Sequence, residues 1–263
     1  MTEQPKPAFG PGSFMWHEHA TRDQKKSMDF YSKVFGWKYE EMDLGPNGKY
    51  QIIKAPGEGP GVGGMMEMKG EWGDMPSHWA YYIDVEDVDA AVARVEGLGG
   101  KVMHPATDIP PGRFAAIQDP TGAHVYIMKP TEHAKEVPCG EPGHFIWVEL
   151  MARDFEKARV FYSELVGWKS EEMPMPEGKY TLFRNTNGNV GGGMEMPHDV
   201  PKEVPSNWVG YIHVADIEKS CKDVEAAGGQ VIFPPMEVPN VGRFSHIADP
   251  NGAMVAIMQP AVM

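Results

Sequence analysis

An eight-residue segment that occurs twice is the feature that most constrains this chain. FYSKVFGW at residues 30–37 returns as FYSELVGW at residues 161–168, half a chain apart in a sequence of 263 residues. Self-similarity over a long, fixed period marks a repeated structural unit. The sequence therefore predicts a tandem duplication.

Shorter motifs repeat in the same order through both halves, which extends the duplication over most of the chain. The pairs are Trp16-x-Glu18 and Trp147-x-Glu149, Arg22-Asp23 and Arg153-Asp154, Gly48–Tyr50 and Gly178–Tyr180, GGMMEM (63–68) and GGGMEM (191–196), Gly112–Phe114 and Gly242–Phe244, and DPTGA (119–123) and DPNGA (249–253). We predict a tail at 1–11, a first domain at 12–130, a Pro-rich charged linker at 131–142, and a second domain at 143–263.

Composition excludes several classes of protein. Hydrophobic residues make up 41% and charged residues 23%, as in ordinary globular domains. The net charge of −13 argues against nucleic acid or an anionic membrane as partner. Cys139 and Cys221 lie outside the repeat symmetry and predict no disulfide framework. With no apolar signal core and no long apolar run, we expect a cytoplasmic protein, either monomer or homodimer.

Each half reads as two modules of one strand, one helix and three strands (βαβββ). In the first module, Asp23 is a candidate N-cap and Gly36 a candidate C-cap, with apolar residues at helical spacing between them. A strand is expected before this helix at 14–21, and three follow at 37–42, 50–55 and 62–68. The second module repeats the plan with strands at 79–85, 101–103, 114–118 and 125–128 around a helix at 87–99; the second half has helices at 154–167 and 216–228.

These residues resemble the vicinal oxygen chelate superfamily, which includes glyoxalase I, bleomycin- and fosfomycin-resistance proteins and extradiol dioxygenases. The features shared are paired βαβββ modules, a helix that ends in FYxxxxGW, and DPxG before the last strand. Trp147–Leu150, WVEL, is similar to the tandem two-domain glyoxalase-like branch. The resemblance implies an α+β fold in which each domain curls a mixed sheet around a cavity, with helices outside. It also implies a small-molecule ligand and, in enzymes, a divalent metal.

The residues at the metal positions implied by the resemblance depart from that pattern. They are Trp16, Ala80 and Tyr126 in the first half, and Trp147, Val209 and Ala256 in the second. None is an ordinary ligand of a divalent metal. We therefore expect no metal at these positions. A shifted site stays open, with Glu18, Glu67 and His78, or Glu149, Glu195 and His213, as ligands.

Strand alternation predicts where the repeated glutamates point. Residues two apart share a face, so Glu149 and Trp147 lie opposite the apolar Ile146, Val148 and Leu150, which should face the helices. Glu149, and by repetition Glu18, is then expected to face the cavity. The alternative is that both glutamates only accept hydrogen bonds from a neighbouring strand or from an arginine such as Arg113 or Arg243.

Two main functions follow, and they share a candidate site. The first is a glyoxalase-like lyase or isomerase for a small carbonyl or hydroxylated metabolite, with a glutamate as general base. The second is a protein that sequesters a small molecule, as bleomycin-resistance proteins do, and a metal-dependent dioxygenase or lyase with a shifted site is a further alternative. The candidate catalytic residues are Glu18, Glu149, His78 and His213, and the candidate substrate-binding residues are Trp16, Tyr82, Arg113, Tyr126, Trp147, Tyr211, Arg243 and His246.

Overall fold

The chain forms four βαβββ modules, seen in a computed structural model that describes residues 10–44, 48–57, 59–70, 74–132, 140–175 and 178–261. The first module comprises β1 (Phe14–Thr21), α1 (Gln24–Phe35), β2 (Lys38–Asp43), β3 (Lys49–Lys54) and β4 (Gly63–Glu67). The second comprises β5 (His78–Asp84), α2 (Val88–Val95), the 3-10 helix η3 (Glu96–Leu98), β6 (Lys101–Ile109), β7 (Gly112–Gln118) and β8 (His124–Pro130). Most of the expected tail and linker, with Cys139, lies outside the described residues.

The second half repeats this order. The third module comprises β9 (Phe145–Ala152), α3 (Phe155–Val166), β10 (Lys169–Met175), β11 (Gly178–Asn185) and β12 (Gly188–Glu195). The fourth comprises β13 (Asn207–His213), α4 (Ile217–Ala226), β14 (Gln230–Val238), β15 (Gly242–Ala248) and β16 (Met254–Pro260).

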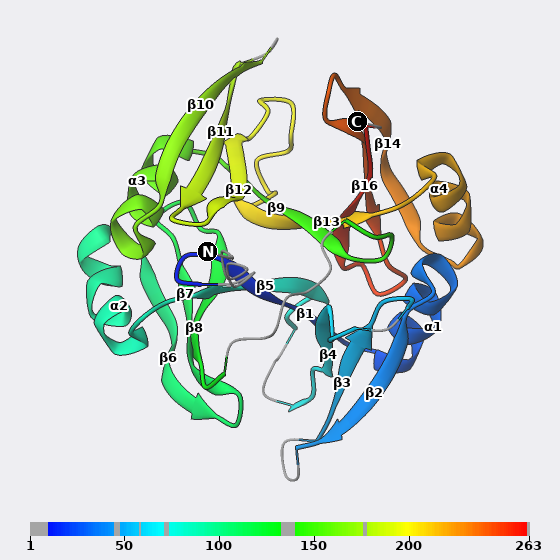
Figure 1. Ribbon diagram of the computed structural model, residues 1–263, viewed down its shortest axis with the longest axis horizontal. Helices are drawn as coiled ribbons and strands as arrows, with labels where there is room; N and C mark the ends of the chain where they lie inside the picture. The colour runs from blue at the N-terminus through cyan, green and yellow to red at the C-terminus, as the bar shows by residue number, and fades with distance from the viewer. Residues whose placement is uncertain are drawn as a thin grey trace, which may run out of the picture. The chain divides into compact units, whose positions relative to one another are not determined.

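Two mixed eight-stranded sheets have the same strand order (Figure 1). The orders are β2-β3-β4-β1-β5-β8-β7-β6 and β10-β11-β12-β9-β13-β16-β15-β14. Within a module the first strand pairs in parallel with the last, and the remaining neighbours are antiparallel. The identical orders confirm the tandem α+β fold expected from the repeats.

Local sequence signals set the helix boundaries. The aspartates Asp23, Asp87, Asp154 and Asp216 each accept a hydrogen bond from a backbone amide of the first helical turn. Gly36 and Gly167 end α1 and α3 in the left-handed conformation, with φ of 70° and 77°. These caps explain why helix boundaries were predicted closely.

The strand expected at 101–103 is longer in the structure. β6 continues to Ile109 although its pairing with β7 shifts register around Pro105. Proline lacks the amide hydrogen that a regular ladder needs, so the strand signal breaks at this residue. The prediction therefore stopped at the irregularity while the strand continues beyond it.

Packing groups the modules into two compact units. Unit 1 holds the second and third modules, mainly residues 81–132 and 147–208, and unit 2 holds the first and fourth, mainly residues 16–80 and 209–261. The sheets follow the two sequence repeats, whereas each compact unit takes one module from each repeat.

The repeated FYxxxxGW motif belongs to the core of each unit. In unit 2, Tyr31 and Trp37 are buried, and the Tyr31 hydroxyl accepts a hydrogen bond of 2.9 Å from Trp79 Nε1. The ring of Phe30 packs directly against Gly229 of the fourth module. A Cβ added to this glycine would lie only 2.5 Å from the Phe30 ring. The motif therefore packs one module against another.

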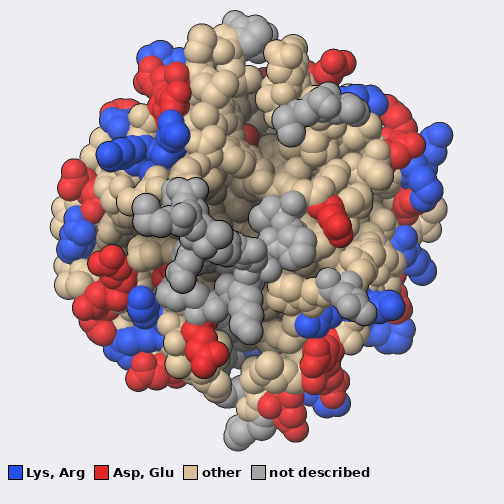
Figure 2. Space-filling view, in the orientation of Figure 1, with Lys and Arg blue, Asp and Glu red and all other residues tan. Residues whose placement is uncertain are grey.

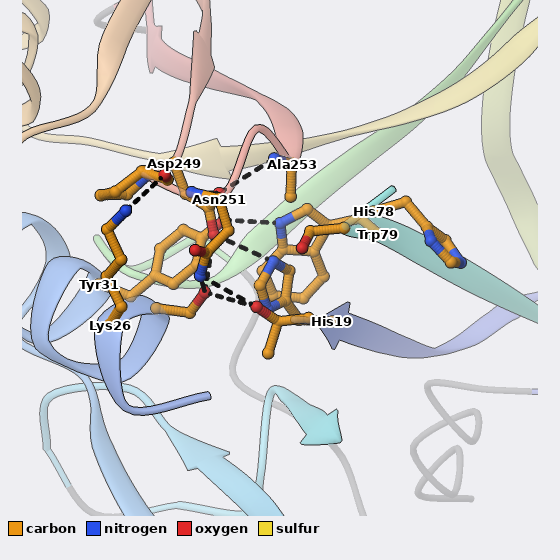
Figure 3. A network of polar contacts seen from close by, with 12 residues as sticks. His19, Lys26, Tyr31, His78, Trp79, Asp249, Asn251 and Ala253 are labelled. Atoms are coloured by element: carbon orange, nitrogen blue, oxygen red, sulfur yellow. Dashed lines mark hydrogen bonds and ion pairs between the residues drawn. The ribbon is translucent and has the colours of Figure 1, made fainter. Parts of the chain in front are cut away.

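A polar network joins the first and fourth modules inside unit 2 (Figure 3). Asp249 accepts hydrogen bonds from Ser27 Oγ at 2.9 Å and from the amides of Asn251 and Ala253 at 2.8 and 2.9 Å. Lys26 Nζ donates to the carbonyl of Pro250 at 3.0 Å. The DPNGA turn is thus held against α1.

Charged side chains of both signs are intermixed on the face shown in Figure 2. Among the described residues, no helix has the length and apolar character needed to cross a membrane.

Candidate functional site

A tryptophan, a tyrosine and a glutamate form a hydrogen-bonded relay on the first module. Trp16 Nε1 donates to the hydroxyl of Tyr50 at 2.8 Å, and that hydroxyl donates to Glu18 Oε2 at 2.8 Å. Trp16 and Glu18 share one face of β1 because they are two residues apart, and Tyr50 reaches them from β3. All three side chains are half-buried. We call this set the Trp–Tyr–Glu relay.

The third module builds the same relay. Trp147 Nε1 donates to the hydroxyl of Tyr180 at 2.8 Å, and Tyr180 is hydrogen-bonded to Glu149. Sequence analysis selected the tryptophans and glutamates but missed both tyrosines. The repeated GKY motif, which contains Tyr50 and Tyr180, was the signal that could have identified them.

Glycines in the GGMMEM and GGGMEM motifs make room for the relay. β4 lies between β1 and β3, and a Cβ on Gly64 would lie 1.9 Å from the Tyr50 hydroxyl oxygen. In the third module, a Cβ on Gly192 would lie 2.5 Å from the Tyr180 ring. A larger residue at either glycine would collide with the tyrosine ring that crosses the intervening strand, so the motif makes room for the relay.

The electrostatics of the relay keep the tyrosines protonated. Burial and the neighbouring charge of Glu18 raise the pKa of Tyr50 well above its usual value. The pKa of Tyr180 is raised for the same reasons, with Glu149 as the neighbouring charge. Each tyrosine therefore acts as a hydrogen-bond donor that fixes one carboxylate oxygen.

The alternation predicted for β9 is confirmed. Val148 and Leu150 are buried. Leu150 and Phe155 of α3 both contact Gly193, which places Leu150 on the helix side of the sheet. Ile146, near the start of the strand, is only half-buried, and Glu149 is half-buried on the opposite face. In β1, His19 takes the place of Leu150 and contacts Tyr31 of α1, with 5.3 Å between ring centroids.

Four aromatic rings stack across the second module, one from each strand. Ring centroids are separated by 5.3 Å from His104 to Phe114, 6.2 Å from Phe114 to Tyr126, and 4.6 Å from Tyr126 to Tyr82. The interplanar angles are 9°, 28° and 20°, so the rings are nearly parallel. We call this row the aromatic ladder. Tyr82 and Tyr126 were candidates from sequence, whereas His104 and Phe114 were missed.

The fourth module arranges its rings differently. Tyr211, Phe233, Phe244 and His246 form what we call the His246 cluster, in which most rings meet edge to face. His246 is 5% exposed, and neither of its ring nitrogens has a hydrogen-bond partner among the described residues. Burial lowers the pKa of His246 to about 4, so its imidazole is neutral at neutral pH.

The two candidate arginines lie on the helix side of their sheets. Arg113 donates to Asp89 of α2 at 2.8 Å and to Asp108 at 2.9 Å, and Arg243 donates to Glu218 of α4 at 2.5 Å. The alternative in which an arginine such as Arg113 or Arg243 donates to the relay glutamates is therefore wrong, because both arginines donate to acidic residues on the helix side. In each GRF motif the phenylalanine that follows the arginine takes the ring-bearing face, because neighbouring residues of a strand point to opposite faces.

The shifted metal sets are not assembled. Glu18 is in register with Gly64, and Glu67 with Thr21, whose hydroxyl contacts Ser27 of α1. Glu67 therefore points to the helix face and forms an ion pair with Lys69, 2.6 Å apart.

Two of the other proposed ligands are also engaged elsewhere. Glu195 accepts a hydrogen bond from the amide of Phe155 at 2.9 Å, and His78 places Nδ1 2.9 Å from the carbonyl of Pro76. His213 lies at the end of β13, and its Nδ1 is buried without a hydrogen-bond partner among the described residues. Across the described ranges, no three His, Cys, Asp or Glu side chains gather in a way that could hold a metal ion.

The positions implied for the metal by family resemblance do not fit one either. The Trp16 and Trp147 indoles donate to tyrosines, and Tyr126 stacks in the ladder. The remaining positions, Ala80, Val209 and Ala256, have no side-chain lone pairs. No step below involves a metal.

Comparisons with known proteins agree with this fold. The family model described as Glyoxalase/Bleomycin resistance protein/Dioxygenase superfamily matches residues 16–127 and 144–257. A putative glyoxylase, CFP32, of Mycobacterium bovis is 37% identical over 256 residues, covering 96% of this chain and 97% of its own. The anthracycline biosynthesis protein DnrV of Streptomyces peucetius is 26% identical over 270 residues, covering 95% and 94%.

A solved structure shares the fold at low identity. The Mn(II)-bound glyoxalase from Novosphingobium aromaticivorans matches with a TM-score of 0.65 and 15% identity, covering 95% of this chain and 82% of its own.

Proposed function

Because the chain belongs to the Glyoxalase/Bleomycin resistance protein/Dioxygenase superfamily, we propose that it is a glyoxalase-like lyase or isomerase that acts on a small carbonyl or hydroxylated metabolite. Glu18 and Glu149 are the proposed general bases. The observation that carries the proposal is that the Trp–Tyr–Glu relay is built twice, each time with a glycine that makes room for it.

The relay suits proton transfer by the carboxylate. An ionised carboxylate has two oxygens with several lone-pair directions, so one oxygen can be held by tyrosine while the group accepts a proton from substrate. The proton would leave a carbon next to a carbonyl, and the electron pair of that bond would move onto the carbonyl oxygen. Returning the proton to a neighbouring atom completes an isomerisation, and loss of a leaving group completes an elimination.

Tyr50 and Tyr180 are positioning residues in this scheme. Their raised pKa values keep the hydroxyl protons in place, so they orient the glutamates and are not themselves bases. The indoles of Trp16 and Trp147 in turn fix the tyrosine oxygens. Fixed geometry of this kind favours a reactive arrangement of base and substrate.

Sequestration of an aromatic ligand is the second candidate function. The aromatic ladder and the His246 cluster offer ring faces and edges to a planar molecule. The relative DnrV is named for anthracycline biosynthesis, and anthracyclines contain fused aromatic rings. In this case the relay glutamates would accept hydrogen bonds from a ligand hydroxyl without turnover.

Glutamate substitutions separate the two functions. The Glu18→Gln/Glu149→Gln double variant keeps the shape of both side chains but removes the base, and Glu164→Gln on the exposed side of α3 is the matched control. We would follow turnover of small 2-oxoaldehydes and 2-hydroxyketones, and ligand binding by calorimetry, with and without a chelator. Loss of turnover with binding retained supports catalysis, whereas unchanged turnover in the double variant refutes it.

A further inference from the structure

One cross-strand pair differs between the second and fourth modules in a reciprocal way. In the second module, Ala116 of β7 lies directly opposite Tyr126 of β8. In the fourth, His246 of β15 lies opposite Ala256 of β16. The aromatic ring is on the last strand in the second module and on the strand before it in the fourth. The alanine is on the other strand of each pair. Directly opposite residues share a face, so the two pairs occupy equivalent places on their sheets.

This exchange changes the order of the rings. Tyr126 completes the aromatic ladder by stacking between Phe114 and Tyr82. His246 instead meets Tyr211 at 6.1 Å and 78°, and Phe233 at 5.6 Å and 76°, so ring edges and faces alternate around it. The fourth module therefore has no continuous stack.

The chemistry of the exchanged ring also changes. A neutral imidazole offers one donor and one acceptor nitrogen. Both nitrogens of His246 are buried without a partner among the described residues. Leaving a buried polar group without a partner destabilises the folded protein, so such groups call for a specific explanation.

The cluster faces away from its helix and reaches the surface. The neighbouring Ser245 points the other way, where its hydroxyl contacts Cys221 of α4. On the His246 side, Phe233 is 44% exposed and Met236, which lies opposite Phe244, is 48% exposed. An aromatic group with unused hydrogen-bonding capacity thus adjoins exposed apolar side chains.

We infer that the His246 cluster is a recognition site for a planar aromatic ligand that carries a hydroxyl or carbonyl group, with His246 as its hydrogen-bond partner. The second module has Ala116 where the fourth has His246, so it lacks an imidazole at this place and the two modules are expected to select different ligands. This inference rests on the proposed small-molecule function and names its ligand class.

The probe pair 2-naphthol and naphthalene tests the inference directly. The two molecules share a planar ring system and differ by one hydroxyl. Histidine side-chain nitrogen NMR spectra of the labelled full-length protein report on His246, whose signals are assigned by their loss in His246→Phe. We expect 2-naphthol, and not naphthalene, to shift the His246 nitrogen signals.

Affinities give a second readout. One net hydrogen bond corresponds to a several-fold change, up to about tenfold, in affinity. We expect 2-naphthol to bind the wild-type protein up to about tenfold more tightly than naphthalene, and His246→Phe to lose that preference while still binding naphthalene.

A double variant that exchanges the two side chains keeps the inference testable if His246→Phe does not fold. His246→Ala/Ala256→Tyr rebuilds in the fourth module the pair that the second module already uses, and it should lose the hydroxyl preference at this site. The matched control, Ala116→His/Tyr126→Ala in the second module, should leave the His246 shifts unchanged.

An unshifted His246 signal at saturating 2-naphthol, or an unchanged hydroxyl preference in His246→Phe, would overturn the inference. Its failure is distinguishable from failure of the proposed enzyme. The glutamate variants are judged by turnover, whereas His246 is judged by binding and its own NMR signals.

Discussion

His19 Nε2 lies 3.1 Å from Asp249 Oδ2, and both side chains are fully buried within unit 2. In unit 1 the equivalent aspartate, Asp119, accepts a hydrogen bond of 3.1 Å from the Tyr162 hydroxyl, and Leu150 stands at the position of His19. The two DPxG turns therefore bury their aspartates in different surroundings, and the surroundings of Asp249 include a histidine.

The histidine makes unit 2 sensitive to acid. Burial lowers the pKa of His19 below 6.5, against the opposing effect of Asp249, so the folded protein binds this proton less readily than the unfolded chain. Stability from this group is present above pH 6.5 and is lost as pH falls below it. The lowered pKa of Asp249 adds a loss only below about pH 4.

We predict that His19→Leu flattens the fall in unfolding free energy between pH 7 and pH 5. At pH 7 the variant should be less stable by about 1–3 kcal/mol, because Asp249 loses a polar neighbour in a buried setting. Urea unfolding at several pH values measures both effects. His198→Gln, a change at an exposed histidine, is the control, and an equally steep profile in His19→Leu would contradict the prediction.

Gly64→Ala should be coupled strongly to Tyr50. The added methyl group collides with the Tyr50 ring, so the substitution should lower the free energy of unfolding by about 1–3 kcal/mol. In a Tyr50→Ala background the same change should cost little, which a double-mutant cycle measures. Gly97→Ala is the control, since no atom lies within 4 Å of its added Cβ. Additive effects of the two changes would show that the relay does not need the glycine.

Tyr162→Phe should destabilise unit 1 by about 2–4 kcal/mol. The buried hydroxyl accepts from Trp208 Nε1 at 2.9 Å and donates to Asp119, so its removal leaves two buried groups short of a partner. Chemical denaturation gives the magnitude. Phe161→Leu, a change at the neighbouring buried ring, is the control for lost packing alone, and a smaller effect of Tyr162→Phe than of that control would count against the hydrogen-bond argument.

Arg153→Gln should loosen residues 196–206. The guanidinium donates to the carbonyls of Val200, at 3.3 Å, and Val204, at 3.0 Å, and also to that of Pro201. Without these bonds the segment should exchange its amide hydrogens faster and be cleaved sooner by protease. Arg159→Gln, which removes an ion pair with Glu156 on the surface of α3, should leave the segment unchanged. Equal protection in Arg153→Gln and wild type would refute this role.

The Arg-Asp motif illustrates what local sequence can reveal. Asp23 was predicted as an N-cap, and the helix of the second half was predicted to start at Asp154, its repeat, because a side chain that satisfies the first helical turn needs only its own neighbours. The function of Arg153 depends on carbonyls about fifty residues away in sequence, at Val200 and Val204. No local pattern marks that contact.

The sequence by itself determined the duplicated βαβββ modules, their helix caps and the alternation that separates Glu149 from Leu150. Periodicity and capping are properties of short segments, and the repeat supplied each of them twice. Only the tertiary structure decided that Tyr50 crosses Gly64 to reach Glu18, that Arg113 faces α2, and that the ring of Tyr126 has its counterpart in His246 on the next strand. These relationships depend on which strands lie side by side and in what register, and that is set by the packing of segments far apart in the chain.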